Sequence, residues 1–238
     1  MGTWIIVPAA GGGTRFGDAT PKQYADLAGA PVLARTLERL ATLDADAIVV
    51  ALAPDDTRYD DAIGARKGVL PLRCGGATRA ATVRKALQAI APRIADDDWI
   101  LVHDAARPCV PREALHRLVR ELRDDAVGGL LALPLGDTLK RASAMDEPPR
   151  VMRTEPREGL WLAQTPQMFR HRLLAAAHGR DAGGQCTDEA QAIEALAATG
   201  VCDMPRLVRG NAANLKITFP GDLALAAAIL RMQEGPSR

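Results

Sequence analysis

The stretch that most constrains the fold is residues 4–24, where a short apolar run leads directly into a glycine-rich turn. Trp4, Ile5, Ile6 and Val7 predict a buried strand. The Ala-Ala-Gly-Gly-Gly at 9–13 lets the backbone come close to a bound molecule. A glycine turn that follows a first strand typically holds phosphate.

Neither of two common phosphate signatures fits this turn. Gly11 and Gly13 begin a G-x-G-x-x-G pattern whose sixth position is Phe16, and no G-x-x-x-x-G-K-[ST] frame is present. What remains is two cations, Arg15 and Lys22, beside exposed backbone N–H groups, which suits a triphosphate. The alternative is that the glycines only shape a tight turn and that both cations are solvated.

The rest of the chain alternates between two apolar patterns. Continuous apolar runs predict strands at 48–53, 69–73, 99–102, 127–133 and 204–208. Apolar residues at helical spacing predict helices at 32–43, 80–90, 111–122 and 188–196 and from 220 onward. Residues 159–167 return the chain to the domain, and 215–218 form a short extended piece. The alternation predicts a doubly wound, mostly parallel, Rossmann-like α/β sandwich, which we expect to be one domain over 1–238.

The segment 136–160 breaks the pattern. Residues 137–141 and 150–154 are polar and extended, and Pro148 and Pro149 lie between them, which predicts a β-hairpin arm. The arm has too few apolar residues for a core and is too long for an ordinary loop. We therefore expect it to pack on a second copy of the chain, in a homodimer.

Charge and cysteine usage exclude several classes of protein. The formal net charge is +1, with 30 basic and 29 acidic residues, so no overall field attracts nucleic acid. Four separated cysteines without a C-x-x-C pair argue against disulfides or structural zinc. The apolar run at 223–230 is too short for a membrane span, and the start of the chain has no export signal, so we expect a cytoplasmic protein.

Asp104 and Arg107 follow the predicted strand 99–102, at the sheet end where α/β proteins bind ligands. The Asp104 carboxylate suits Mg²⁺ beside phosphate, although capping a turn is the alternative. Lys216 is ambiguous, because a lysine before a terminal helix is usually exposed to solvent.

The chain offers few nucleophiles of its own. Its two serines, Ser143 and Ser237, lie in the hairpin tip and the tail, which argues against a serine nucleophile. The histidines lack metal-ligand spacing, so we interpret all four as structural or exposed: His103, His116, His171 and His178. A phosphomonoester is mostly dianionic at neutral pH and can attack without a general base. The composition therefore favours nucleotidyl transfer by positioning and charge neutralisation.

Taken together, these segments resemble the 2-C-methyl-D-erythritol 4-phosphate cytidylyltransferases of the non-mevalonate isoprenoid pathway, over essentially the whole chain. The motifs that carry the resemblance are PAAGGGTR at 8–15, PKQY at 21–24, VHDAARP at 102–108, DTLK at 137–140, TPQ at 165–167, TDEA at 187–190 and NLKIT at 214–218.

The resemblance implies a nucleotidyltransferase sandwich that binds CTP, Mg²⁺ and methylerythritol phosphate. The implied catalytic residues, which act on the reacting phosphates, are Arg15, Lys22 and Lys216. The implied nucleotide-binding residues are Ala9, Ala10, Gly11, Gly12, Gly13, Thr14, Gly76, Thr82, Asp104 and Ala105. Asp104 is also the implied Mg²⁺ ligand. The implied residues for the second substrate, of which Thr138 and Arg157 would come across the dimer, are Arg107, Thr138, Arg157, Thr165 and Thr187.

Two departures from the family pattern are visible. Ala77-Thr78 stands where the family often has Asp-Glu, which removes an expected polar contact, and Phe16 replaces a methionine. A ribitol 5-phosphate cytidylyltransferase is a close alternative that would share the CTP loop, Asp104 and Lys216. An oxidoreductase would need an intact dinucleotide fingerprint, and a non-catalytic binding module would need neither cations nor a metal carboxylate.

Overall fold

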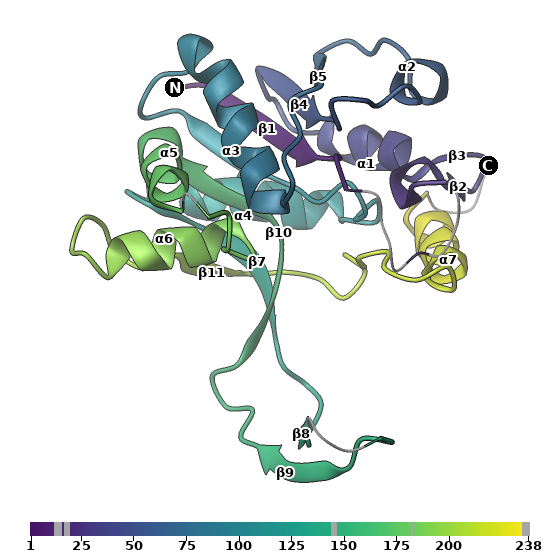
Figure 1. The fold of residues 1–238 in the computed structure, drawn as a ribbon, viewed down its shortest axis with the longest axis vertical. Coiled ribbons are helices and arrows are strands. Elements are labelled where there is room, and N and C mark those ends of the chain that lie inside the picture. The colour runs from purple at the N-terminus through teal and green to yellow at the C-terminus, as the bar shows by residue number, and fades with distance from the viewer. Residues whose placement is uncertain (12–15, 17–19, 144–146, 182, 235–238) are drawn as a thin grey trace.

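A mixed sheet runs through the molecule. The computed structural model describes residues 1–11, 16, 20–143, 147–181 and 183–234. The strands of the sheet are β1 (Thr3–Pro8), β4 (Ala47–Ala51), β5 (Val69–Leu72), β6 (Trp99–Val102), β7 (Gly128–Pro134), β10 (Trp161–Arg170) and β11 (Arg206–Arg209). Their order is β11-β7-β10-β6-β1-β4-β5 (Figure 1). A small pair, β2 (Asp26–Leu27) and β3 (Ala30–Pro31), lies apart from it.

The sheet is parallel except at β10. β1 pairs in parallel with β4 and β6, β4 with β5, and β7 with β11. β10 runs antiparallel to β6 and β7. The prediction of a mostly parallel, doubly wound sheet is confirmed. The prediction that residues 159–167 only return the chain to the domain was wrong, because most of them belong to the central strand β10. The buried polar residues Gln164, Thr165 and Gln167 interrupt the apolar pattern by which a buried strand is recognised.

Helices cover both faces of the sheet. Their bounds are α1 (Val32–Leu40), α2 (Tyr59–Ala62), α3 (Arg79–Ile90), α4 (Arg112–Leu122), α5 (His171–Arg180), α6 (Glu189–Ala197) and α7 (Asp222–Glu234). Short 3₁₀ helices occupy Lys22–Tyr24 and Ala91–Arg93. α1 and α4 pack on one face, and α3, α5 and α6 pack on the other. The predicted crossover helices are confirmed, whereas α2 and α5 were not predicted.

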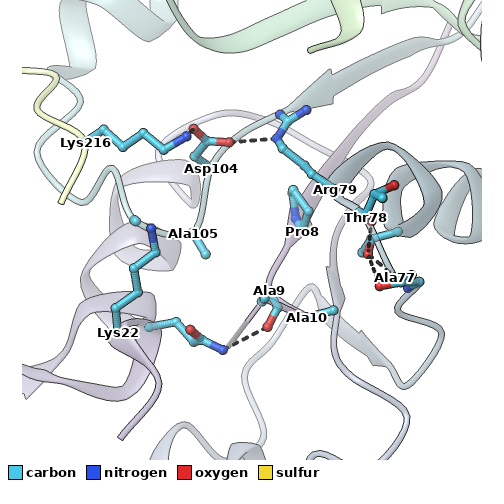
Figure 2. A pocket seen from close by; sticks show the side chains of 15 residues that line it. Pro8, Ala9, Ala10, Lys22, Ala77, Thr78, Arg79, Asp104, Ala105 and Lys216 are labelled. Atoms are coloured by element: carbon cyan, nitrogen blue, oxygen red, sulfur yellow. Dashed lines mark hydrogen bonds and ion pairs between the residues drawn. The ribbon is translucent and has the colours of Figure 1, made fainter. Parts of the chain in front are cut away.

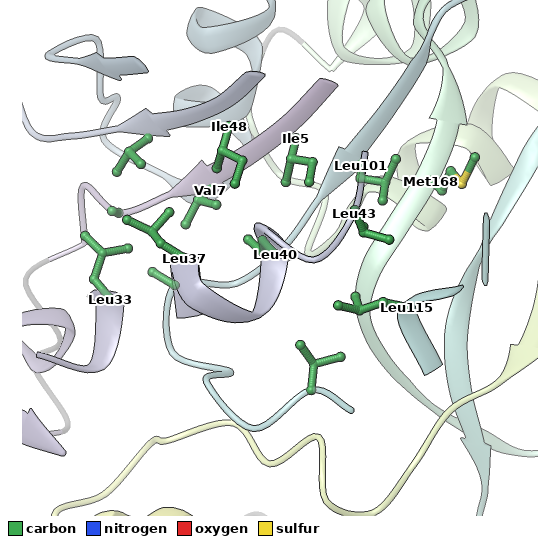
Figure 3. Packing of buried hydrophobic residues seen from close by; sticks show 14 of the residues in the cluster. Ile5, Val7, Leu33, Leu37, Leu40, Leu43, Ile48, Leu101, Leu115 and Met168 are labelled. Carbon is green, nitrogen blue, oxygen red and sulfur yellow. The ribbon is translucent and has the colours of Figure 1, made fainter. Parts of the chain in front are cut away.

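Alternation along the strands divides the core between the two faces. Ile5 and Val7 of β1 join Leu37 of α1 in one apolar cluster (Figure 3). Ile6, between them in sequence, joins the cluster of Val83 and α3 on the opposite face. Burying one such side chain completely stabilises the fold by about 1.5–3 kcal/mol, so these layers hold the loops at the strand ends in place.

The starts of α3 and α6 follow local capping rules. The Thr78 side chain accepts a hydrogen bond from the Ala81 N–H, and the Asp188 side chain accepts one from the Gln191 N–H. The second bond lies at the start of the helix predicted over 188–196, which is confirmed. Both helices start at the edge of the sheet where the site lies.

The arm is a hairpin that projects away from the sheet (Figure 1). Its strands are β8 (Leu139–Ala142) and β9 (Val151–Glu155), which pair antiparallel. Lys140 Nζ donates to Thr154 Oγ1 at 2.7 Å across the pair. The predicted hairpin is confirmed, although residues 144–146 of its tip lie outside the described residues.

The C-terminal segment differs in detail from the prediction. The last strand is two residues later at its start than expected, because β11 pairs with β7 over Arg206–Arg209. Residues 215–218 join no strand of the described chain, and the Ile217 N–H donates to the Ala106 carbonyl at 2.8 Å. α7 begins at Asp222, whose carboxylate accepts hydrogen bonds from the Thr218 and Phe219 N–H groups. Within the described residues, no helix has the length and apolar character needed to cross a bilayer.

Candidate active site

Two neighbouring cavities lie at the carboxyl ends of β1 and β6. The larger, of about 300 Å³, brings together nine of the predicted residues (Figure 2). These are Ala9, Ala10, Gly11, Lys22, Gly76, Thr82, Asp104, Ala105 and Lys216. The smaller, of about 160 Å³, contains Arg107, Thr165 and Thr187 and shares Asp104 and Lys216 with the first.

The remaining predicted residues fall elsewhere. Gly12, Gly13, Thr14 and Arg15 lie outside the described residues. Thr138 and Arg157 belong to the arm and line neither cavity of their own chain. Arg157 donates from Nη1 to the Gly136 carbonyl within the arm.

Lys22 lies on a 3₁₀ turn that is tied to the sheet. Gln23 Nε2 donates to the Ala9 carbonyl at 3.0 Å, and Tyr24 Oη donates to Asp56 Oδ2 at 2.8 Å. Lys22 Nζ itself donates to the Ile217 carbonyl at 3.3 Å. These bonds fix the backbone under the lysine, so that its ammonium borders the larger cavity.

The second glycine turn has no room for side chains. A Cβ at Gly75 would lie 2.4 Å from Ala10 Cβ, and one at Gly76 would lie 2.6 Å from Ala81 Cβ. The Gly76 N–H donates to Thr82 Oγ1 at 3.0 Å, and Thr82 Oγ1 donates to the Thr78 carbonyl at 2.9 Å. The Thr82 hydroxyl therefore shapes the turn that forms one wall of the larger cavity.

Asp104 is the electrostatic centre of the site. Its Oδ1 lies 3.0 Å from Arg79 Nε, and its Oδ2 lies 2.9 Å from Lys216 Nζ and 3.5 Å from Arg107 Nε. Burial by itself would raise the pKa of this carboxyl, but the three cations outweigh burial and hold the pKa well below its usual range. Asp104 is therefore ionised at neutral pH.

Arg79 was not found from the sequence. It lines both cavities and pairs with Asp104 and with Glu189 of α6. One signal was available: Arg79 starts a helix right after a glycine turn, and a cation there opposes the helix dipole. Its two partners come from distant parts of the chain, which no local pattern reveals.

The strand end behind Asp104 is held by buried polar groups. The Asp104 N–H donates to Thr165 Oγ1 at 3.0 Å, and Thr165 Oγ1 lies 3.2 Å from His103 Nδ1. Burial lowers the pKa of His103 to about 4, so this ring is neutral at neutral pH. His103 is structural, as predicted. Arg107 Nη1 donates to the Asn214 carbonyl at 2.6 Å, which ties the smaller cavity to the C-terminal segment.

The donor set fits a magnesium ion that binds together with phosphate. The described residues contain no group of three or more histidine, cysteine or acidic side chains placed to hold a metal. Among the described residues that line both cavities, Asp104 is the one that carries a carboxylate, a hard oxygen ligand. Mg²⁺ commonly takes one or two protein carboxylates and completes its shell with water and substrate phosphate.

Comparison with known proteins agrees with this arrangement. The family model described as IspD, 2-C-methyl-D-erythritol 4-phosphate cytidylyltransferase, matches residues 3–232. The chain belongs to this family. A protein of that name from Dechloromonas aromatica (strain RCB) is 52% identical over 236 residues, covering 97% of this chain and 98% of the relative. Another from Laribacter hongkongensis (strain HLHK9) is 54% identical over 227 residues, covering 94% of each.

Solved structures of family members share the fold. A crystal structure of 4-diphosphocytidyl-2C-methyl-D-erythritol synthase superposes with a TM-score of 0.82 at 39% identity, covering 97% of this chain and 98% of the other. The 2-C-methyl-D-erythritol 4-phosphate cytidylyltransferase from Thermus thermophilus gives 0.75 at 34% identity, covering 96% and 98%. The resemblance seen in the sequence is confirmed, and the oxidoreductase and the non-catalytic module are disfavoured.

Proposed function

We propose that this chain transfers the cytidylyl group of CTP to 2-C-methyl-D-erythritol 4-phosphate, giving 4-diphosphocytidyl-2-C-methyl-D-erythritol and pyrophosphate. The observation that carries the proposal is the position of Asp104, with its three cations, between two cavities in a member of this family. The names of the relatives favour methylerythritol phosphate over ribitol phosphate as the acceptor.

The larger cavity suits the nucleotide. Its lining includes Ala9, Ala10 and Gly11 of the first glycine turn and Gly76 of the second, which place little side-chain bulk between the backbone and a bound base or phosphate. Ala77 offers no polar side chain, and the hydroxyl of Thr78 caps α3. We therefore assign base contacts to the backbone near Gly76 and to Thr82.

The reaction needs no nucleophile from the protein. A phosphate oxygen of the acceptor attacks the α-phosphorus of CTP, the bond from that phosphorus to the oxygen bridging to the β-phosphate breaks, and pyrophosphate leaves. Lys22 and Lys216 border the larger cavity and would stabilise the negative charge that grows on these oxygens. We assign the same role to Arg15.

The smaller cavity suits the acceptor. Arg107, Thr165 and Thr187 line it, and they supply a cation and two hydroxyl groups for a phosphorylated polyol. A magnesium ion held by Asp104 and the nucleotide would neutralise phosphate charge. Lys216 and Arg79, which now contact the two Asp104 oxygens, hold this carboxylate in place.

We assign the arm to a neighbouring copy. Leu139, Val151 and Met152 are exposed on it, at 39%, 66% and 60%, and it projects away from the sheet (Figure 1). A homodimer would cover these side chains and bring Thr138 and Arg157 of one copy to the acceptor site of the other. The cysteines Cys74, Cys109, Cys186 and Cys202 are free, which supports a reducing cytoplasm.

Pyrophosphate release tests the activity. The protein would be supplied with CTP and Mg²⁺ and, in separate reactions, with methylerythritol phosphate, ribitol 5-phosphate or glycerol phosphate. We expect release with methylerythritol phosphate to exceed the other two, and Lys22→Ala to lose it while Lys67→Ala, at an exposed loop, keeps it. Faster pyrophosphate release with ribitol 5-phosphate would identify it, instead of methylerythritol phosphate, as the acceptor. Release with none of the three acceptors would refute the proposal that the chain is a cytidylyltransferase.

Complementation tests the arm. Lys22→Ala damages the body of the site and Arg157→Gln damages the arm, so each homodimer is expected to be weak. Co-expressed chains would form mixed dimers in which one site combines an intact body with an intact arm from the partner. Recovered turnover supports an arm that acts across the dimer, and turnover no higher than in the separate variants contradicts it.

A further inference from the structure

One guanidinium joins two carboxylates from distant parts of the chain. Arg79 Nη1 and Nη2 donate to Glu189 Oε1 and Oε2 at 2.7 and 2.9 Å, and Arg79 Nε donates to Asp104 Oδ1 at 3.0 Å. The bond to Asp104 is visible in Figure 2. All three nitrogens of the Arg79 guanidinium therefore donate hydrogen bonds to carboxylates.

Glu189 is a fully buried acid. Its exposed fraction is 0%. Its other close basic neighbour, His178 Nε2, lies 3.9 Å away, and burial lowers the pKa of that imidazole, so the ring is neutral at neutral pH. Burying a carboxylate is costly unless it is paired with good geometry, and the bidentate pair with Arg79 meets that condition.

The position of Glu189 is itself fixed from β10. Gln167 Oε1 accepts a hydrogen bond from the Ala190 N–H at 2.7 Å, and Gln167 Nε2 donates to Asp188 Oδ2 at 2.9 Å. The first turn of α6 is thereby attached to a central strand. A continuous set of contacts runs from Gln167 through the start of α6 and Arg79 to Asp104.

Resting on the proposed function, we propose that Glu189 is a positioning residue for cytidylyl transfer. By engaging both Nη atoms of Arg79, it leaves Nε for Asp104 Oδ1 and so directs Oδ2 toward Lys216, on the side where the reacting phosphates bind. It also prevents the Arg79 Nη groups from turning into the cavities. Glu189 touches no substrate in this arrangement and acts through Arg79.

The test compares Glu189→Gln, Arg79→Gln and the double variant with the wild-type chain. Losing a residue that orients a side chain of the active site typically lowers activity by about 10–100-fold. We expect Glu189→Gln to lower kcat by about that factor, with the KM for CTP unchanged within about threefold, because binding contacts remain. Glu194→Gln, an exposed acid on the same helix, should keep wild-type kcat.

The double variant separates positioning from charge compensation. It replaces the carboxylate of Glu189 and the guanidinium of Arg79 by two amides that can still hydrogen-bond to each other. Neither side chain is then left as an unpaired buried charge, so the double variant can be measured even where Glu189→Gln folds poorly. We expect its melting temperature to recover toward wild type while kcat stays low. Recovery of kcat together with stability would overturn the inference, as would wild-type kcat in Glu189→Gln. A wild-type chain inactive with CTP and every acceptor would instead overturn the proposed function.

Discussion

Lys216 Nζ lies 2.9 Å from Asp104 Oδ2, which closes the C-terminal segment onto the end of β6. The same segment is held by the Ile217 N–H on the Ala106 carbonyl, at 2.8 Å, and by Lys22 Nζ on the Ile217 carbonyl, at 3.3 Å. Lys22 and Lys216 are far apart in sequence but border the same cavity, because hydrogen bonds to the backbone of Ile217 hold the C-terminal segment beside Lys22 and Asp104.

Replacing Lys216 by methionine tests its charge. Lys216→Met keeps most of the side-chain volume but removes the ammonium, so we expect kcat to fall by about 10²–10³, the cost typical of losing one group that stabilises transition-state charge. Steady-state pyrophosphate release gives the value. Lys67→Met, at an exposed position, serves as the control, and equal kcat in the two variants would contradict the role of Lys216.

Gly75 tests the nucleotide side of the site. In Gly75→Ala the new methyl would meet Ala10 Cβ at 2.4 Å and the Leu52 carbonyl at 2.7 Å, so the turn must move. We expect a loss of about 1–3 kcal/mol in stability and a KM for CTP raised by about tenfold or more. Gly179→Ala, which meets nothing within 4 Å, is the matched control. An unchanged KM for CTP in Gly75→Ala would show that this turn does not contribute to CTP binding.

His178 is expected to make stability depend on pH. Burial lowers its pKa below the ordinary value of 6.5; Glu189 and Asp181 oppose the shift, whereas Arg79 and Arg84 add to it. As pH falls through 6.5, the unfolded chain binds a proton that the folded chain excludes, so folding stability falls. Urea unfolding between about pH 7 and pH 5 should show a weaker pH dependence in His178→Gln than in wild type. His116→Gln, at an exposed histidine, should keep the wild-type dependence, and an equally steep slope in His178→Gln would exclude His178 as a source.

The core predicts a simple contrast in stability. Leu37 of α1 is 1% exposed and Leu225 of α7 is 54% exposed. Leu37→Ala leaves a cavity and should lower the free energy of unfolding by about 2–5 kcal/mol, whereas Leu225→Ala should change it by less than about 1 kcal/mol. Urea denaturation measures both, and comparable losses would mean that the Leu225 face is covered in solution.

Much of the fold was readable from local patterns. Apolar runs and helical spacing predicted β1, β4, β6 and β7 and the helices α1, α3, α4 and α6, because burial on a sheet or a helix leaves a regular trace in sequence. β10 escaped, since its buried Gln164, Thr165 and Gln167 serve the site and the start of α6 and interrupt that trace. α5 also escaped prediction.

The site divides in the same way. Lys22 and Asp104 were predicted from local patterns and Lys216 from the resemblance to the family. The structure places these three residues around one cavity. Arg79 and Glu189 were missed, because their ion pair, with Arg79 Nη1 2.7 Å from Glu189 Oε1, joins segments that are far apart in the sequence.

The sequence by itself determined most of the strands and helices, the glycine-rich composition of residues 9–13 and the resemblance to the family, because these depend on neighbouring residues and on the period of burial. The tertiary structure decided which charges meet. Asp104 is surrounded by Arg79, Arg107 and Lys216 because the end of β6, the start of α3 and the segment before α7 meet at the carboxyl ends of the strands. Short-range ion pairs depend on distances of a few ångströms, which are set by the crossing of distant segments and not by spacing along the chain.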